Sequence, residues 1–382
     1  MKSKKKYTTI ILLFFIIIFP SNNFQKNTFE NKEMAIDNSS TSSLDEILKN
    51  TTTFEVLNKS KEFQSIKGSQ SDINELDINL PFNFRPLLPV FLTDNTFLFI
   101  AYTFKNTVSP TETYIYKYNL KTKSLEKIHS LKLYINAFTE HLHKSKYSKI
   151  LENGNIVFKL TENILIIDKT NLNIIKNIHI PNNYRNSCVD ISKDGKKILY
   201  TDENGLYTDS IDFSNQKKIF NLKNSDYSIL NPLWSDNNSI VFNLYQNKLI
   251  GTCIIKNNSK NVNFIKTNNL TTETWFKNSY KMIGTIGNVD SKKIAIIDFK
   301  NKFIEKYPIK NLNYCGTINP KYNNKFYLVY DYGICIFDYK NKTQTKYKIY
   351  MKFDELQSGS WSPQGKELIN ISNRKFQLIK IK

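Results

Sequence analysis

The chain has 382 residues, with 54 Lys plus Arg against 34 Asp plus Glu and a formal net charge of +20. Apolar residues make up 40% of it and aromatic residues 13%, which excludes a wholly disordered chain. The 4 cysteines exclude a disulfide-dense scaffold, and the 11 glycines exclude a collagen-like repeat.

Lysine carries almost all of the positive charge, because the only arginines are Arg85, Arg185 and Arg374. Recognition of base edges and bidentate binding of phosphate favour the planar arginine side chain. The composition therefore predicts no nucleic-acid partner and favours a solvated lysine surface. Attraction of the lysines to anionic cell-wall polymers or lipid headgroups is the functional alternative.

The N-terminus has the pattern of an export signal. An uncharged apolar run at 8–19 follows the lysines Lys2, Lys4, Lys5 and Lys6. A run of that length suits a signal peptide better than a full membrane span, which needs about 20 residues. We predict that residues 1–20 are a signal peptide or, if uncleaved, a short membrane anchor. The protein is expected to be exported and extracytoplasmic, either secreted or anchored to the outer face of the cytoplasmic membrane.

Residues 21–70 are rich in Asn, Ser, Thr and Lys. This composition predicts a polar, largely disordered tether, with one short helix around Leu44–Leu48. The β-rich remainder, 71–382, is expected to form one domain.

That domain is built from repeats. The clearest unit, ISKDGKKILYT at Ile191–Thr201, is an apolar residue, a polar turn and an alternating strand. Similar units recur every 41 to 43 residues from Ile150 to Trp361, and another begins at Leu92. A large apolar residue stands before each turn, where we expect it to pack between neighbouring units: Leu92, Ile150, Ile191, Trp234, Trp275, Ile318 and Trp361.

A second signature, exemplified by IIDKTN at 166–171 and IIDFKN at 296–301, predicts a hairpin turn in the later half of the units. Four antiparallel strands per unit, repeated radially, make a β-propeller. We predict an all-β propeller with seven four-stranded blades, with six or eight as the alternatives. The last unit has room for three strands, so a strand at Leu76–Leu80 is expected to close the ring.

The units at 191–201 and 361–371, the latter WSPQGKELINI, resemble the repeat of TolB-like propellers and of the propeller domains of prolyl-oligopeptidase relatives. The resemblance covers roughly residues 85–382 and implies the fold more than the function. In the TolB-like family it implies six blades after an α/β domain that contacts partners, whereas this chain has seven units after a short polar tract. No hydrolase domain is expected after the last unit.

No catalytic motif stands out: G-x-S-x-G, Walker A and H-E-x-x-H are missing from the sequence. His141 and His143 would share one face of a strand and are the candidate metal ligands, but no third ligand is evident nearby. No cofactor is predicted. The cysteines occupy repeat-equivalent positions in non-neighbouring units, so free buried thiols are expected rather than disulfides.

The residue before each packing position points to the opposite strand face and is a candidate for lining the central channel. The polar members of this set are Lys149, Asp190, Thr274, Thr317 and Ser360. One acid, one base and three hydroxyl groups do not form a catalytic constellation.

The sequence leaves three functions open. The first is a non-catalytic, monomeric binding or scaffold module for a protein or an anionic cell-envelope polymer. The second is an extracytoplasmic hydrolase or lyase that uses the axial face of the propeller. The third is a subunit of an envelope or spore-associated assembly, held by the N-terminal segment.

Overall fold

The computed structural model describes residues 44–49, 51–59, 64–81, 83–103, 111–133, 147–160, 162–180, 189–222, 226–235, 237–257, 259, 261–267, 269–288, 292–308, 312–330, 333–349, 358–372 and 374–381. The chain divides into two units, Met1–Asn38 and Ser39–Lys382. All described residues belong to the second unit, and the predicted leader at 1–20 lies outside them.

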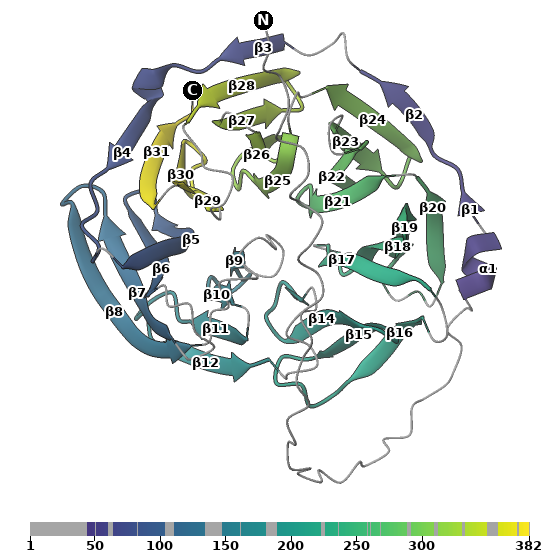
Figure 1. The fold of residues 1–382 in the computed structure, drawn as a ribbon, viewed down its shortest axis with the longest axis horizontal. Helices are drawn as coiled ribbons and strands as arrows, with labels where there is room; N and C mark the ends of the chain where they lie inside the picture. Colours follow the sequence, from purple (N-terminus) through teal and green to yellow (C-terminus); the bar gives the residue numbers. More distant parts are fainter. Residues whose placement is uncertain are drawn as a thin grey trace, which may run out of the picture. The chain divides into compact units, whose positions relative to one another are not determined.

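The second unit is a propeller of seven antiparallel blades arranged in a ring, as predicted (Figure 1). Strands such as β17, β21 and β25, each the first of its blade, face the middle of the ring, and the fourth strands face outwards. Three of the seven sheets carry a fifth strand from the N-terminal part of the chain.

The blades are numbered in chain order. Blade 1 contains β5 (Phe84–Thr93), β6 (Thr96–Thr103), β7 (Thr111–Asn119) and β8 (Ser124–Leu133). Blade 2 contains β9 (Tyr147–Ile150), β10 (Ile156–Lys159), β11 (Asn163–Ile167) and β12 (Ile174–His179). Blade 3 contains β13 (Asp190–Ile191), β14 (Lys197–Asp202), β15 (Gly205–Ser210) and β16 (Lys217–Asn221). Blade 4 contains β17 (Ser228–Trp234), β18 (Ile240–Gln246), β19 (Lys248–Ile255) and β20 (Val262–Lys266).

Blade 5 contains β21 (Leu270–Trp275), β22 (Lys281–Ile286), β23 (Lys293–Asp298) and β24 (Phe303–Pro308). Blade 6 contains β25 (Leu312–Ile318), β26 (Lys325–Tyr330), β27 (Gly333–Asp338) and β28 (Thr343–Lys348). Blade 7 contains β29 (Ser358–Trp361), β30 (Glu367–Ser372), β31 (Lys375–Lys380) and the N-terminal β4 (Ile73–Leu76).

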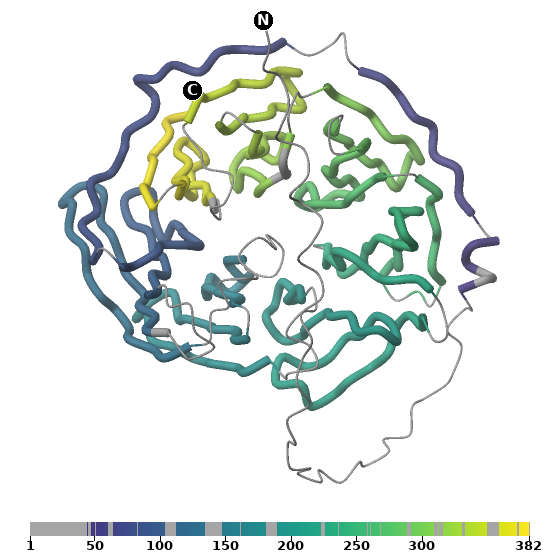
Figure 2. The backbone as a smooth tube through the Cα atoms, viewed as in Figure 1, coloured from purple at the N-terminus to yellow at the C-terminus, as the bar shows by residue number. Residues whose placement is uncertain are grey.

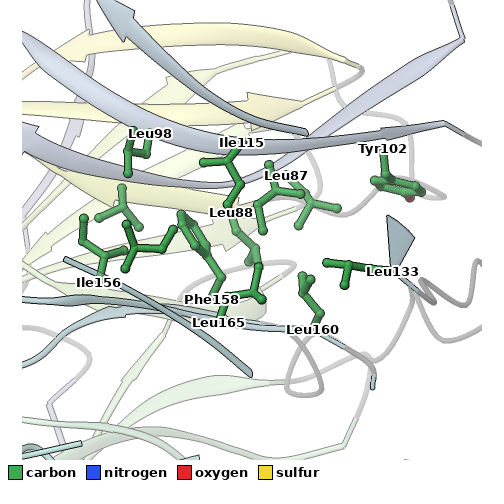
Figure 3. Packing of buried hydrophobic residues seen from close by; sticks show 13 residues of the cluster. Leu87, Leu88, Leu98, Tyr102, Ile115, Leu133, Ile156, Phe158, Leu160 and Leu165 are labelled. Atoms are coloured by element: carbon green, nitrogen blue, oxygen red, sulfur yellow. The ribbon is translucent and has the colours of Figure 1, made fainter. Parts of the chain in front are cut away.

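The core consists of seven hydrophobic clusters, one in each seam between neighbouring blades. Each blade packs on both of its faces, so its middle strands are buried continuously; β27, for example, is buried at every residue. Figure 3 shows the seam between blades 1 and 2, where Leu98 and Ile115 meet Phe158 and Leu165. Each fully buried side chain of this size contributes about 1.5–3 kcal/mol of transfer free energy.

An N-terminal strand closes the ring, as predicted, but it lies three residues earlier than expected. β4 pairs antiparallel with β31, with Leu76 opposite Phe376 and Ile73 opposite Ile379. After Leu76 the chain bends, because the amide of Ile78 donates to the carbonyl of Leu76 and the amide of Leu80 to that of Ile78. The alternating residues Leu76, Ile78 and Leu80 therefore all pack in the seam between blades 7 and 1.

The N-terminal part of the chain, up to and including β4, forms a belt along the outer edge of the ring (Figure 2). The belt is defined here as residues 44–49, 51–59 and 64–76. It begins with α1 (Leu44–Lys49), the predicted short helix. β1 (Thr51–Thr52), β2 (Glu55–Asn58) and β3 (Gln64–Lys67) then add in parallel to β20, β24 and β28. A short 3-10 helix, Gln70–Asp72, leads into β4.

The expectation of a largely disordered tether over residues 21–70 therefore does not hold for the part of that range that the structure describes. Strands added to a sheet edge are held by backbone hydrogen bonds, which polar residues form as readily as apolar ones. Two apolar anchors help: Ile47 lies in the seam between blades 3 and 4, and Phe54 in the seam between blades 4 and 5.

Candidate functional site

The predicted packing residues of blades 3 to 7 lie in the seams. Each of them belongs to the cluster between its own blade and the preceding one: Ile191, Trp234, Trp275, Ile318 and Trp361. The position is therefore occupied by a large side chain in consecutive blades.

In blade 1 the position belongs to Phe91 and not to Leu92. Phe91 pairs with Phe97 as Trp361 pairs with Leu368, and it is buried between blades 7 and 1. Leu92 packs in the following seam, between blades 1 and 2. The cause is irregular register in β5, between Leu87 and Val90 and between Phe91 and Thr93, which displaces the pattern by one residue.

The prediction for Ile150 was wrong, because its side chain is 50% exposed. The next residue, Leu151, is buried between blades 2 and 3, where it contacts Gly195. Leu151 stands where blade 3 has the turn residue Ser192, so the apolar contribution of this unit comes one residue later.

Two predicted channel residues, Lys149 and Asp190, make polar contacts that connect three blades. The ammonium of Lys149 donates to the carbonyl of Ile191 at 2.7 Å and lies 3.6 Å from Oδ1 of Asp190. Asp190, only 8% exposed, accepts from the amide of Trp234 at 2.7 Å through its other oxygen. Burial, reinforced by the charge of Asp190, raises the pKa of the neighbouring Tyr147 well above its usual value. These charged groups thus connect the inner strands of blades 2, 3 and 4.

The hydroxyl residues of the same set lie on the inner strands of blades 5 to 7. The Ser360 hydroxyl accepts from the amide of Phe91 at 3.4 Å, which links blade 7 to blade 1. The carbonyl of Thr317 accepts from Nε1 of Trp361 at 3.1 Å. Thr274 is half-buried on β21. That the five residues line a central channel stays a prediction.

Metal and thiol chemistry gains no support in the described part of the chain. His141 and His143 lie outside the described residues, and among those described no group of three or more His, Cys, Asp or Glu could hold a metal ion. Cys253 and Cys335 are free and buried. Burial raises the pKa of the Cys335 thiol to about 12 and that of Cys253 well above its usual value. Over the same residues no helix has the length and apolar character of a membrane span.

One edge of the ring carries two turns from each of blades 1 to 6 and one turn from blade 7, and we call it the turn edge. It gathers the turns between first and second strands and those between third and fourth strands, which lie at the same end of an antiparallel sheet. In blade 5 the amide of Phe299, in the later turn, donates to the carbonyl of Tyr280, in the earlier one. The amide of Tyr339 makes the same bond to Asn324 in blade 6.

The signature predicted hairpin turns in the later half of the units, and aspartates fix those of blades 5 and 6. In blade 5 one oxygen of Asp298 accepts from the amides of Lys300 and Asn301, and the other accepts from Nδ2 of Asn301. Burial alone would raise the pKa of Asp298, but the bonds from Asn301 and the nearby Lys281 ammonium outweigh it and hold that pKa below its usual value. Asp338 binds Asn341 in the same way in blade 6.

Neighbouring turns are also bonded to one another. Nδ2 of Asn323, in blade 6, donates to the carbonyl of Lys277, in blade 5, at 2.7 Å, and its Oδ1 accepts from the Lys277 amide. These contacts set the exposed tips of the two blades in a fixed relation. Sequence reasoning missed two residues there, the exposed Tyr280 and Tyr322. Their signal is an aromatic residue inside an otherwise polar turn, as in FKNSYK and NPKYNNK.

The fold and these contacts between neighbouring blades define the class of protein, a seven-bladed β-propeller. Neither a protein-family model nor a curated protein matches the sequence. Solved structures share the fold. An oligogalacturonate lyase in complex with manganese is 12% identical with a TM-score of 0.56, over 81% of this chain and 93% of that one.

A catalytically inactive virginiamycin B lyase from Staphylococcus aureus with quinupristin is 14% identical with a TM-score of 0.53, over 81% of this chain and 99% of that one. The Pan2 WD40 domain of Neurospora crassa is 11% identical with a TM-score of 0.52, over 82% of this chain and 96% of that one. At these identities the likeness shows the fold alone.

Proposed function

We propose that this protein is an exported, TolB-like propeller that acts as a monomeric, non-catalytic binding or scaffold module for a protein or an anionic cell-envelope polymer. One observation carries the proposal. Two charged groups on the inner strands, Lys149 and Asp190, are bonded to backbone atoms of neighbouring blades and hold the ring together. Exposed charge lies on the turns and on the outer strands, where the ring presents it to a partner.

The structural role of Asp190 is directly testable. Asp190→Ala removes the acceptor of the Trp234 amide and the partner charge of Lys149, so the free energy of unfolding should fall by about 1–3 kcal/mol. Partner binding by the fraction that remains folded should be unchanged. A variant of wild-type stability that has lost binding would contradict this assignment and place Asp190 in a binding site.

The binding role is tested with the full chain immobilised and offered an envelope fraction and purified acidic polysaccharides. We expect retention of a stoichiometric protein or of a polymer whose length is unchanged after incubation. Light scattering on the free protein should give the mass of a monomer. Retention of neither class of partner would count against the proposal.

A lyase acting on polysaccharide or peptide is the second candidate, because two of the structures that share the fold are named as lyases. It predicts that polygalacturonate, or another acidic polymer, is shortened and gains ultraviolet absorbance from an unsaturated product. Manganese is added in one arm of the experiment and a chelator in the other. Product formation in either arm would favour the enzyme over the scaffold.

Export itself is proposed from the lysine cluster and apolar run at 1–20. Protease added to intact cells should digest the protein while a cytoplasmic marker survives. The N-terminal residue of the mature chain then distinguishes a cleaved signal from a retained anchor. A third role, as a subunit of an envelope or spore-associated assembly, predicts co-purification with membrane fractions.

A further inference from the structure

The turn edge of blades 5 and 6 is the most uniformly basic part of that edge. Its four turns, 276–280, 299–302, 319–324 and 339–342, are described throughout and contain no acidic residue. Their exposed lysines are Lys277, Lys300, Lys302, Lys321, Lys340 and Lys342. The four turns together are called the lysine arc below.

Two of the acids beside the arc are buried and already engaged by lysines. Asp298 is 1% exposed and lies 3.2 Å from the Lys281 ammonium, and the buried Asp338 lies 3.8 Å from that of Lys325. Lys281 and Lys325 stand at the strand ends below the tips and are themselves only partly exposed. The two buried carboxylates therefore neutralise these inner lysines and not the lysines at the tips. Glu55, exposed in β2, lies beside Lys302, and the half-buried Glu305 accepts from the Tyr339 hydroxyl at 2.9 Å. The six exposed lysines of the arc outnumber these two acids.

Two tyrosines are exposed within the same arc. Tyr280 is 44% exposed and Tyr322 is 41% exposed. Backbone bonds hold both in place: the carbonyl of Tyr280 accepts from Phe299, and the amide of Tyr322 donates to Oδ1 of Asn319. The Asn323–Lys277 bonds described above join the two turns that carry them. A tyrosine presents a flat apolar face and a polar edge, which is the pattern of a sugar ring.

The same edge of blades 2 and 3 differs. Glu152, Asp194 and Asp212 are exposed there, and the Glu152 carboxylate lies 2.7 Å from the Lys193 ammonium. Hydrogen bonds from Ser210 and Ser214 lower the pKa of Asp212 to about 2, so it is charged at any physiological pH. The turn edge of blades 5 and 6 is thus more basic than that of blades 2 and 3, and this difference does not follow from the overall charge alone.

We propose that the lysine arc binds an anionic polysaccharide, a chain of sugar rings that carry carboxylate or phosphate groups. This inference rests on the proposed binding function and names its surface and partner class. Lysine ammonium groups, as point charges, suit acidic groups spaced along a flexible polymer, and the arc contains no arginine for bidentate recognition. Its two phenylalanines, Phe276 and Phe299, are buried and so are not available to insert into a lipid surface.

The test measures affinity of the full chain for immobilised hyaluronate, phosphorylated mannan and neutral dextran, with oligothymidylate and polyglutamate as the other polyanions. One variant combines Lys300→Gln, Lys302→Gln, Lys340→Gln and Lys342→Gln. Its matched control combines Lys121→Gln, Lys123→Gln, Lys169→Gln and Lys196→Gln, which removes the same charge from exposed turn-edge lysines of blades 1 to 3. Tyr280→Ala and Tyr322→Ala are the tyrosine variants. Their control is Tyr245→Ala, because Tyr245, in blade 4, is similarly exposed at 38%.

We expect hyaluronate or phosphorylated mannan, but not dextran, to bind, and the acidic polymer that binds identifies the acid group. The arc variant should bind at least about tenfold more weakly, with less salt dependence, and the charge control within about twofold of wild type. Each of the variants Tyr280→Ala and Tyr322→Ala should bind the acidic polysaccharide about fivefold more weakly than wild type, and Tyr245→Ala should bind it with unchanged affinity.

If the arc variant and the charge control lose affinity equally, the lysine arc is not the binding site, although the binding function itself still stands. Oligothymidylate or polyglutamate that binds as tightly as the polysaccharides, through the same lysines, would overturn the partner class. If no polysaccharide binds, the inference fails, and the proposed function then rests on a protein partner from the envelope fraction.

Discussion

The buried side chain of Asn243 makes the sharpest stability prediction. It lies on β18 in blade 4, fully buried, and its amide reaches across the seam to blade 5. Nδ2 donates to Oγ1 of Thr252 at 2.9 Å and to the carbonyl of Leu270 at 3.0 Å. Oδ1 accepts from the amide of Thr272 at 3.2 Å and from its hydroxyl at 3.0 Å.

Asn243→Ala removes all four bonds. The amide of Thr272 and the carbonyl of Leu270 would then lose a partner inside the seam, and each such loss costs about 1–3 kcal/mol. Two of them predict a decrease of about 4 kcal/mol in the free energy of unfolding, a large share of the ~5–15 kcal/mol typical of native proteins. Asn243→Leu keeps the side-chain volume and should cost about as much, because leucine makes none of the four hydrogen bonds.

Urea unfolding followed by fluorescence and circular dichroism measures this loss. Trp275 packs in the seam between blades 4 and 5, which Asn243 bridges, so its emission reports on the affected seam. Asn263→Ala, at an exposed position of β20, is the matched control and should change stability by less than about 0.5 kcal/mol. If Asn243→Leu restores wild-type stability, the loss in Asn243→Ala comes from a cavity, and the hydrogen-bond reasoning is refuted.

Three further predictions concern closure, thiols and acid. Deleting residues 71–82 removes β4 and should abolish soluble, protease-resistant protein; a deletion that melts like the full chain would show that the ring closes without it. Cys335, whose pKa burial raises to about 12, should resist alkylation at neutral pH until the protein is denatured, and peptide mapping by mass spectrometry detects any earlier reaction. The depressed pKa of Asp298 gives stability that is present above its unfolded pKa of about 3.9 and is lost as pH falls through the lower folded value. The difference in melting temperature between wild type and Asp298→Asn should therefore shrink as pH falls through that window, and a difference independent of pH would disprove the assignment.

The number and order of the blades were predictable because a repeat leaves two independent marks on the chain. The large residue before the first turn and the polar residue that opens the later turn recur with nearly the same period. The exact closing strand was less predictable, since the alternation of Leu76, Ile78 and Leu80 fits a strand and a series of tight turns equally well. The displacement from Leu92 to Phe91 likewise depends on an irregular register that side-chain identity does not reveal.

The belt escaped prediction for a different reason. β3 is exposed at all of its residues, so it has no apolar pattern to detect, and it is held by backbone pairing with β28. A faint signal does exist in the spacing of apolar pairs about ten residues apart, Leu44 with Ile47, then Phe54 with Leu57. Ile47 and Phe54, one from each pair, enter successive seams, so the belt advances by one blade over these seven residues.

The lysine arc needed the structure because its character depends on which charges are buried. The sequence places aspartates beside the lysines of both later turns, and this pattern alone predicts a mixed surface. In the fold, Asp298 and Asp338 face inwards and bind the asparagines of their own turns, while the lysines remain at the tips. Charge counted along the chain therefore understates the potential at this edge.

The belt also bears on the shape of the arc. Lys302 and Lys342 have left-handed backbones, with φ of 57° and 52°, which costs a residue with a side chain about 1–2 kcal/mol. Surrounding contacts must hold such residues in place. The carbonyl of Lys302 accepts from the amide of Glu55 in β2, and that of Lys342 accepts from the amide of Gln64 in β3. The segment that leads from the N-terminus thus fastens the two turns that carry four of the six exposed lysines of the arc, so the belt stabilises the geometry of the proposed binding surface.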